Sequence, residues 1–267
     1  MCLRSKTIVL CTLPVLFLAC AVSAVFLSHA SSSTQTTQNP VQTSTRKMRN
    51  LSLQPEAFKL SRRLGNRFSS SRQTSSTVLG TLSTGALQQN VNVVRSQTST
   101  GENVGIGLAG AVGTLTWSDV DGPKAFGSTV SEGQRTLIER LVLDSPDQFV
   151  LAQLRGASYY TVSHNVRADP GGSDNYEGPL WDVIRVEEPE TEATRRPLSN
   201  SRLYYINVQT GLIDKIVSEV RGEKIEANVL QWVDQAGEKV PSRMVWKRGN
   251  ETVQEFRLTS FAMQPQQ

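Results

Sequence analysis

The side chains that most often carry enzymatic chemistry are scarce in this chain and lie outside the usual motifs. Its 267 residues include two histidines, His29 and His164, so a Ser-His-Asp triad in the folded part would have to rest on His164. The same count excludes a zinc site built there from a pair of histidines. The Gly-x-Ser-x-Gly elbow of many hydrolases is absent. We therefore expect no catalytic residue, no metal and no cofactor.

Two motifs match part of a known ligand-binding signature, but the residues around them do not support binding of a dinucleotide or of calcium. Residues Gly105–Gly110 match the dinucleotide fingerprint, which requires a helix to begin there, but strand-forming residues follow at Val112–Trp117. Asp119–Gly122 is half of a calcium loop, without the third oxygen position or the downstream glutamate. We expect a sheet bend and a turn, and in Glu187–Glu192 a charged loop. A hydrolase that uses two distant carboxylates leaves no local signature and stays an alternative.

The N-terminus reads as an export signal. Arg4 and Lys6 precede an uncharged run, Thr7–Leu27. Cleavage after Ala24 satisfies the small-residue rule, the whole run is long enough for a single membrane anchor, and Cys20 lies in a loose lipobox. All three fates place the protein outside the cytoplasm, in the periplasm or anchored and facing it.

Cysteine usage and charge exclude further classes of protein. The three cysteines, Cys2, Cys11 and Cys20, all belong to this leader, so the folded part has no disulfide and no thiolate nucleophile. Residues 1–50 carry five basic and no acidic side chains, whereas the remainder carries 23 basic and 24 acidic ones. A nucleic-acid-binding domain would spread its positive charge over one face of the fold, so we expect no nucleic acid partner.

Three regions follow from composition. We expect a signal peptide or membrane anchor in residues 1–27, a disordered Ser/Thr/Gln-rich linker in residues 28–50 and a single β-rich domain in residues 51–267. A helical pattern runs from Pro55 to about Phe68 with basic residues opposite its apolar side. It predicts a helix docked on a sheet, or alternatively a basic helix on anionic lipid.

The pattern of the domain is strands, a helical pair and more strands. Strands are expected at Thr77–Leu82, Val91–Arg95 and Val104–Trp117, and helices within Ser131–Leu154, where Pro146 restarts a helix with a capping-box pattern. The remaining strands have hairpin spacing, which predicts an antiparallel meander: Ala157–Arg167, Pro179–Val186, Arg202–Val208, Leu212–Val220, Lys224–Val233, Ser242–Lys247 and Thr252–Ala262.

Both faces of these last strands are partly apolar. In residues 225–233, Ile225, Ala227 and Val229 share one face, whereas Leu230 and Trp232 lie on the other. A sheet with one wet face alternates cleanly. The second face is therefore expected to meet helices, another sheet or an apolar ligand, and the pattern leaves open whether the interior is filled or hollow.

The stretch Leu203–Ile213, the strand Lys224–Asp234, the turn Gly237–Pro241 and the end of the last strand at Leu258–Ser260 resemble the C-terminal meander of the LolA/LolB superfamily. That superfamily includes lipoprotein carriers and the sensor domain of envelope-stress regulators. Asn207 stands where its members usually have Asp.

The resemblance implies a mainly β (α+β) fold: a strongly curved antiparallel sheet, or half-barrel, whose concave face is roofed by a helical plug and holds acyl chains. We accordingly expect a non-enzymatic envelope protein that binds an apolar or lipid ligand, such as the acyl group of a lipoprotein. A surface or periplasmic interaction module with a filled sandwich core is the alternative. The residues expected to line the concave face are Trp181, Tyr204, Ile206, Trp232, Met244, Trp246, Phe256 and Leu258.

Overall fold

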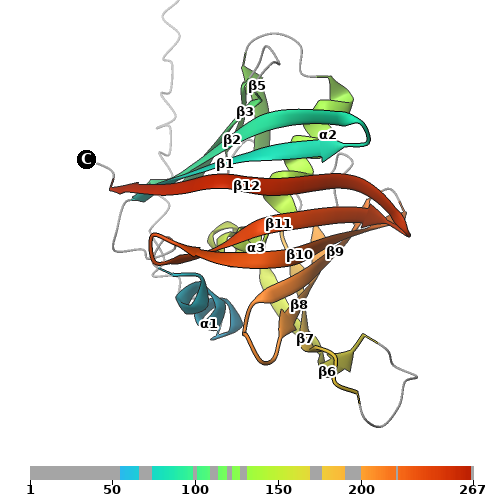
Figure 1. Ribbon diagram of the computed structural model, residues 1–267. Helices are drawn as coiled ribbons and strands as arrows, with labels where there is room; N and C mark the ends of the chain where they lie inside the picture. The colour runs from blue at the N-terminus through green and yellow to red at the C-terminus, as the bar shows by residue number, and fades with distance from the viewer. Residues whose placement is uncertain are drawn as a thin grey trace, which may run out of the picture. The chain divides into compact units, whose positions relative to one another are not determined.

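Figure 1 shows the chain as a computed structural model. Chain contacts divide it into two compact units, Met1–Lys47 and Met48–Gln267, and every described element belongs to the second. The expected signal and linker lie outside the described residues. The structure describes residues 55–65, 74–98, 101–108, 114–118, 122–126, 131–168, 176–189, 200–220 and 222–265.

The elements alternate as strands, helices and strands. The helices are α1 (Pro55–Leu64), α2 (Glu132–Leu143) and α3 (Pro146–Leu151), followed by the 3-10 helix η1 (Ala152–Arg155). The strands are β1 (Thr74–Thr84), β2 (Leu87–Thr98), β3 (Gly101–Leu108), β4 (Thr114–Ser118), β5 (Gly122–Phe126), β6 (Ser158–Arg167), β7 (Leu180–Glu187), β8 (Ser201–Asn207), β9 (Ile213–Val220), β10 (Glu223–Gln235), β11 (Glu238–Arg248) and β12 (Glu251–Pro265).

All twelve strands form one antiparallel sheet in the order β5-β4-β3-β2-β1-β12-β11-β10-β9-β8-β7-β6. Two meanders, β1–β5 and β6–β12, meet where β1 pairs with β12. Because β5 and β6 are the two edges, the helices between them in sequence pass from one edge to the other. Figure 1 shows the sheet curving around α2 and α3. The predicted curved antiparallel sheet with a helical plug is confirmed.

The curvature has a local basis in register shifts. One shift, between Leu79 and Gly80 of β1, lies at the seam between the meanders. A Cβ at Gly80 would lie 2.3 Å from the Phe256 ring and 2.5 Å from the Arg257 carbonyl oxygen, so the seam requires a residue without a side chain. Further shifts interrupt β6/β7, β8/β9, β10/β11 and β11/β12, and such bulges bend strands.

Both edges of the sheet are poor templates for pairing with another chain. β5 is five residues long and contains Pro123. β6 has two register shifts, and its Asn165 has a positive φ of 50°. Short, bulged or proline-containing edges resist edge-to-edge aggregation.

Several predicted boundaries are corrected. The strand expected at Val104–Trp117 is an antiparallel hairpin of β3 and β4, and Gly110 and Gly113 fall between them in the sequence. α1 ends at Leu64 because Gly65 takes a φ of 116°. Pro146 does begin α3, but Ser145 makes no capping hydrogen bond; the capping box lies instead between Ser131 and Gln134 at the start of α2.

Candidate functional site

The inner face of the sheet, defined as the face that α2 and α3 cover, carries a straight row of side chains across six strands. Directly opposed residues in antiparallel pairs share a face. Following the register from β7 to β12 gives one continuous row, which we call the transverse row: Ile184, Tyr204, Ile216, Ala227, Trp246 and Gln254.

The transverse row is covered by the helices. Phe149 of α3 meets Tyr204 edge to face, with ring centroids 4.9 Å apart, and meets Tyr159 at 5.2 Å. Gln254 donates from Nε2 to the Leu137 carbonyl of α2 at 3.2 Å. Tyr204 and Trp246 are fully buried, and both belong to the hydrophobic core. The inner face and the helices therefore form one core.

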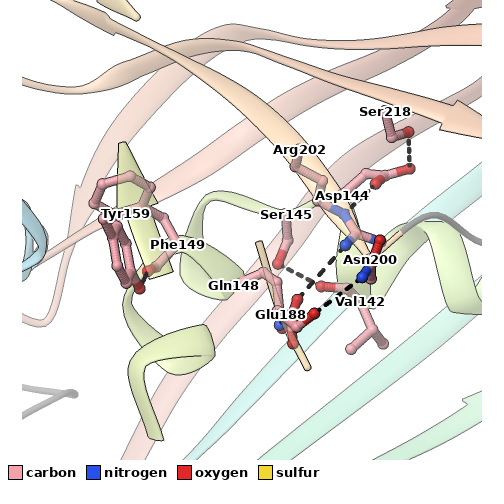
Figure 2. A network of polar contacts seen from close by, with 10 residues as sticks. All are labelled: Val142, Asp144, Ser145, Gln148, Phe149, Tyr159, Glu188, Asn200, Arg202 and Ser218. Atoms are coloured by element: carbon pink, nitrogen blue, oxygen red, sulfur yellow. Dashed lines mark hydrogen bonds and ion pairs between the residues drawn. The ribbon is translucent and has the colours of Figure 1, made fainter. Parts of the chain in front are cut away.

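A buried polar cluster lies beside the row and joins the helices to the sheet (Figure 2). Arg202, next to Tyr204 along the same face of β8, donates from Nε to Asp144 Oδ1 at 2.9 Å, and its Nη1 lies 3.5 Å from Glu188 Oε1. Gln148 of α3 donates to the same Glu188 oxygen at 2.9 Å. Ser218 of β9 donates to Asp144 Oδ2 at 3.4 Å. One guanidinium thus holds the end of α2 and, through Glu188, the start of α3.

A second arginine reaches the same helix junction from the other meander. Arg95 of β2 donates from Nη2 to Ser145 Oγ at 3.4 Å, and its Nε lies 3.8 Å from Asp147 Oδ2. The Ser145 hydroxyl donates in turn to the Val142 carbonyl at 2.7 Å. The α2–α3 junction is therefore held from both halves of the sheet.

The surroundings of Arg202 favour the charged form of its guanidinium. Burial alone would lower the pKa of the guanidinium, but Asp144, Tyr204 and Glu188 outweigh that effect and raise it. Burial also raises the pKa of the Tyr204 hydroxyl well above its ordinary value. Asp144 and Glu188 are almost completely buried and share one cation, so these two carboxylates do not form the open acidic cleft that a hydrolase requires.

Several buried polar atoms have no hydrogen-bond partner in the part of the chain that the structure describes. In the transverse row these are the Tyr204 hydroxyl, Trp246 Nε1 and Gln254 Oε1; in the polar cluster they are Arg202 Nη2 and Gln148 Oε1. An unsatisfied buried polar group costs about 1–3 kcal/mol, and folded proteins satisfy most such groups. Five such atoms lie in or beneath α2 and α3, so this part of the inner face carries more unsatisfied polar groups than a packed core ordinarily does.

Most residues expected to line the concave face do lie together. Tyr204, Met244, Trp246 and Phe256 are buried members of the core, and Ile206, Trp232 and Leu258 are partly buried against it.

Trp181 is placed differently. It opposes Asn207, one residue out of phase with the Ile184–Tyr204 pair, so it faces outward. There it donates to Asp214 at 2.8 Å and meets Tyr205 edge to face, with Lys215 lying 4.1 Å from the Tyr205 ring.

The polar cluster was missed by sequence reasoning. Glu188 was assigned to a charged loop, yet it is buried against Arg202. Arg202 itself carried a usable signal, because strand alternation places it on the face of Tyr204. Asp144 and Gln148 gave none, since a polar residue at a helix end is ordinarily read as a cap.

The glycine motif and His164 are not arranged as ligand sites in the part of the chain that the structure describes. Gly105 and Gly107 lie within strand β3, as expected for a sheet and not for a dinucleotide loop. His164 is exposed beside Asp182, with Nδ1 3.1 Å from Oδ1. Asp119–Asp121 and Glu190–Glu192 lie outside the described residues. Among the residues described, no group of histidine, cysteine or acidic side chains is arranged to hold a metal ion.

The described helices are all short. None of them has the length and apolar character needed to cross a lipid bilayer.

Comparisons with known proteins find similarity in structure alone. No protein-family model matches the chain, and no curated protein matches it. A LolA superfamily protein from Nitrosomonas europaea matches with a TM-score of 0.46 at 8% identity, over 79% of this chain and 94% of that one. A putative outer membrane lipoprotein-sorting protein domain from Vibrio parahaemolyticus matches with 0.46 at 6%, over 78% and 92%.

A third match is the MucA/MucB complex of Pseudomonas aeruginosa, with a TM-score of 0.27 at 11% identity, over 78% of this chain and 56% of that one. The matching structures thus include LolA superfamily and lipoprotein-sorting proteins, the group that the C-terminal meander resembles in sequence. At these identities and TM-scores the matches carry no conclusion about a ligand or a role.

Proposed function

We propose that this protein binds an apolar or amphipathic ligand on the inner face of its sheet, with α2 and α3 acting as a movable cover, and that it does so without catalysis. The observation that carries the proposal is a set of polar atoms in an otherwise apolar row that have no hydrogen-bond partner among the described residues: the Tyr204 hydroxyl, Trp246 Nε1 and Gln254 Oε1. A guest with an apolar body and a polar group supplies what this row lacks.

The composition of the row supports an amphipathic guest. Ile184, Ile216 and Ala227 offer apolar surface, and the aromatic rings of Tyr204 and Trp246 add more. Ligand sites in proteins are mostly apolar, with a few polar groups that orient the guest. The N–H of Trp246 donates and the amide oxygen of Gln254 accepts, so the polar group of the guest is expected to do both, as a protonated carboxyl or an amide does.

Access requires the cover to move, because Tyr204 and Trp246 are fully buried in the closed arrangement. The sheet beneath is paired strand to strand from β6 to β12, so its backbone hydrogen bonds do not depend on the helices. α2 and α3 have 12 and six residues. Elements that move to admit a ligand belong to the less stable part of a fold, so the proposal places α2 and α3 there.

The proposed setting is the cell envelope. The uncharged run Thr7–Leu27 supports export, to the periplasm or to a membrane-anchored position facing it. An acyl chain of a lipid or of a lipoprotein partner is the ligand class proposed there, since acyl chains are long, apolar and end in a polar group.

The test is to purify the protein from its producing cells without added detergent and to analyse the extracted lipid by mass spectrometry. A fluorescent fatty acid is then titrated into the delipidated protein. The proposal expects co-purified lipid or a saturable rise in fluorescence. Neither lipid nor probe binding would contradict it.

A matched pair of variants locates the binding. Trp246→Phe removes the indole N–H of the inner face that has no partner among the described residues, whereas Trp181→Phe makes the same substitution on the outer face, where the indole N–H donates to Asp214. We expect the first to weaken probe binding by about three- to tenfold, the value of one net hydrogen bond, and the second to leave it unchanged. Equal effects would place the probe elsewhere.

A protein-interaction module is the second candidate, and one observation favours it. Trp181, Tyr205 and Lys215 form a cluster on the outer face, with Tyr160 and Arg185 stacked nearby at 5.4 Å. Aromatic residues and arginine are enriched where proteins bind each other. If Tyr205→Ala abolishes capture of an envelope partner while probe binding persists, the outer face binds the partner.

A further inference from the structure

The outward side of α1 carries a basic and aromatic surface that the proposed ligand site does not use. Ala57, Leu60 and Leu64 are buried, and the helix packs on α3 and β11. The expectation that this helix docks on the fold therefore holds for its apolar side. Its other side exposes four residues, which we call the α1 surface: Phe58, Lys59, Arg62 and Arg63.

Phe58 is the apolar residue among these four, and a large apolar residue is ordinarily buried. Here 51% of its surface is exposed to solvent. The guanidinium of Arg62 lies over the Phe58 ring, 5.8 Å from its centroid. An exposed aromatic ring flanked by cations is the arrangement by which helices lie in the interface of a bilayer, with the ring among the acyl chains and the cations at the headgroups.

A neighbouring turn adds to the apolar part of this surface. Arg63 lies against the turn between β8 and β9, where a Cβ at Gly211 would lie 3.2 Å from Arg63 Nε. Gly211 also has a positive φ of 68°, so both its backbone and its neighbour favour glycine. The same turn exposes Val208, at 47%.

The sequence before α1 has the same charge. Arg46, Lys47 and Arg49 precede the helix, and Glu56 is the one acidic residue in the first 63. The uncharged run Thr7–Leu27 also precedes α1 in the sequence. Basic residues near an apolar segment are attracted to anionic lipid headgroups, at about 1 kcal/mol for each Lys or Arg at the surface.

We propose that the α1 surface binds the headgroup region of an anionic phospholipid bilayer. Phe58 enters the interface, and Lys59, Arg62 and Arg63 contact phosphate groups. This proposal is independent of the ligand site, because the α1 surface faces solvent and the transverse row lies in the core.

The test uses residues 48–267, a compact unit that contains the whole described core and lacks the uncharged run, which would insert into lipid by itself. Cosedimentation is measured with vesicles of phosphatidylglycerol and phosphatidylcholine in equal parts, and with vesicles of phosphatidylcholine alone. We expect binding to the first, weakened by salt, and little binding to the second. Equal binding to both, or binding to neither, would overturn the proposal.

Matched variants assign the binding to the α1 surface. Arg62→Ser with Arg63→Ser, and separately Phe58→Ser, are each expected to weaken binding about tenfold or more. Lys247→Ser with Arg257→Ser removes the same charge from exposed positions on β11 and β12, and Leu230→Ser removes a similarly exposed apolar residue. If these controls weaken binding as much as the α1 variants, general charge attraction explains the result and the proposal fails.

The fold and the ligand site are checked in the same samples. Circular dichroism of each variant shows whether the unit remains folded, and titration with the fluorescent fatty acid reports on the inner face. The proposal requires that Arg62→Ser with Arg63→Ser retain both signals while losing affinity for vesicles. Loss of vesicle binding only together with loss of the fold would contradict a role for the surface itself.

Discussion

Arg202 is the residue on which the attachment of the helices to the sheet most depends. It holds Asp144 and approaches Glu188, and all three side chains are almost completely buried. Removing one member of a buried ion pair leaves an unpaired charge in a medium of low dielectric constant. The stability of the cover therefore resides in a few directional contacts as well as in apolar packing.

Asp144→Ala is expected to lower the free energy of unfolding by about 3–5 kcal/mol, because Arg202 would keep its charge without its closest partner. Urea denaturation measures the change. Asp234→Ala is the matched control, since Asp234 pairs with Lys239 at an exposed position and should change stability by less than about 1 kcal/mol. If the two variants lose similar amounts of unfolding free energy, the buried ion pair contributes no more to stability than the exposed one.

The predictability of residues differs within this site. Tyr204 and Trp246 were found because alternation along a strand is regular and large apolar side chains are buried. Arg202 could have been placed by the same alternation. Its partner Glu188 could not, because nothing in the run Glu187–Glu192 distinguishes a buried carboxylate from exposed ones.

At the scale of elements, the seam between β1 and β12 joins the two meanders into one sheet, and Gly80 is its tightest point. Gly80→Ala is expected to lower stability by about 1–3 kcal/mol, because the added methyl group would overlap the Phe256 ring and the Arg257 carbonyl. Gly133→Ala is the control: it lies in the first turn of α2 with open space around it and should stabilise by up to about 1 kcal/mol. Thermal unfolding compares them, and a stable Gly80→Ala protein would contradict the close packing at the seam.

The cover is expected to open more readily than the sheet. We predict that the backbone amides of α2 and α3 exchange hydrogen faster than those of β10 and β11, because the strands are central in the sheet and the helices are short. Mass spectrometry of amide exchange measures this, and added fatty acid should alter the exchange of the helices selectively. Equal protection of helices and central strands, unchanged by fatty acid, would argue against a movable cover.

Elements were predictable where hairpin spacing was regular. The strands from β8 to β12 agree with the expected positions within a few residues, because turn residues separate them at short intervals. The strand expected at Val104–Trp117 is instead the antiparallel pair β3 and β4, because residues that favour strands throughout do not show where the chain reverses. The short strand β5 was not expected, since five residues including Pro123 give little alternation.

At the scale of the whole molecule, one fact of topology explains why a helical pair covers the inner face. The last strand before the helices and the first after them are opposite edges of the sheet, so the connection between them has to pass across it. We propose that this connection moves to admit a guest to the inner face. Sequence patterning showed that both faces were partly apolar, but not what covered each of them.

The central claim is that the inner face accepts an amphipathic guest beside Trp246. The most direct measurement is titration of the delipidated protein with a fluorescent fatty acid, compared among the unaltered protein, Trp246→Phe and Trp181→Phe. We predict saturable binding that Trp246→Phe weakens and Trp181→Phe leaves unchanged. An absence of binding to the unaltered protein, or equal weakening by both substitutions, would contradict it.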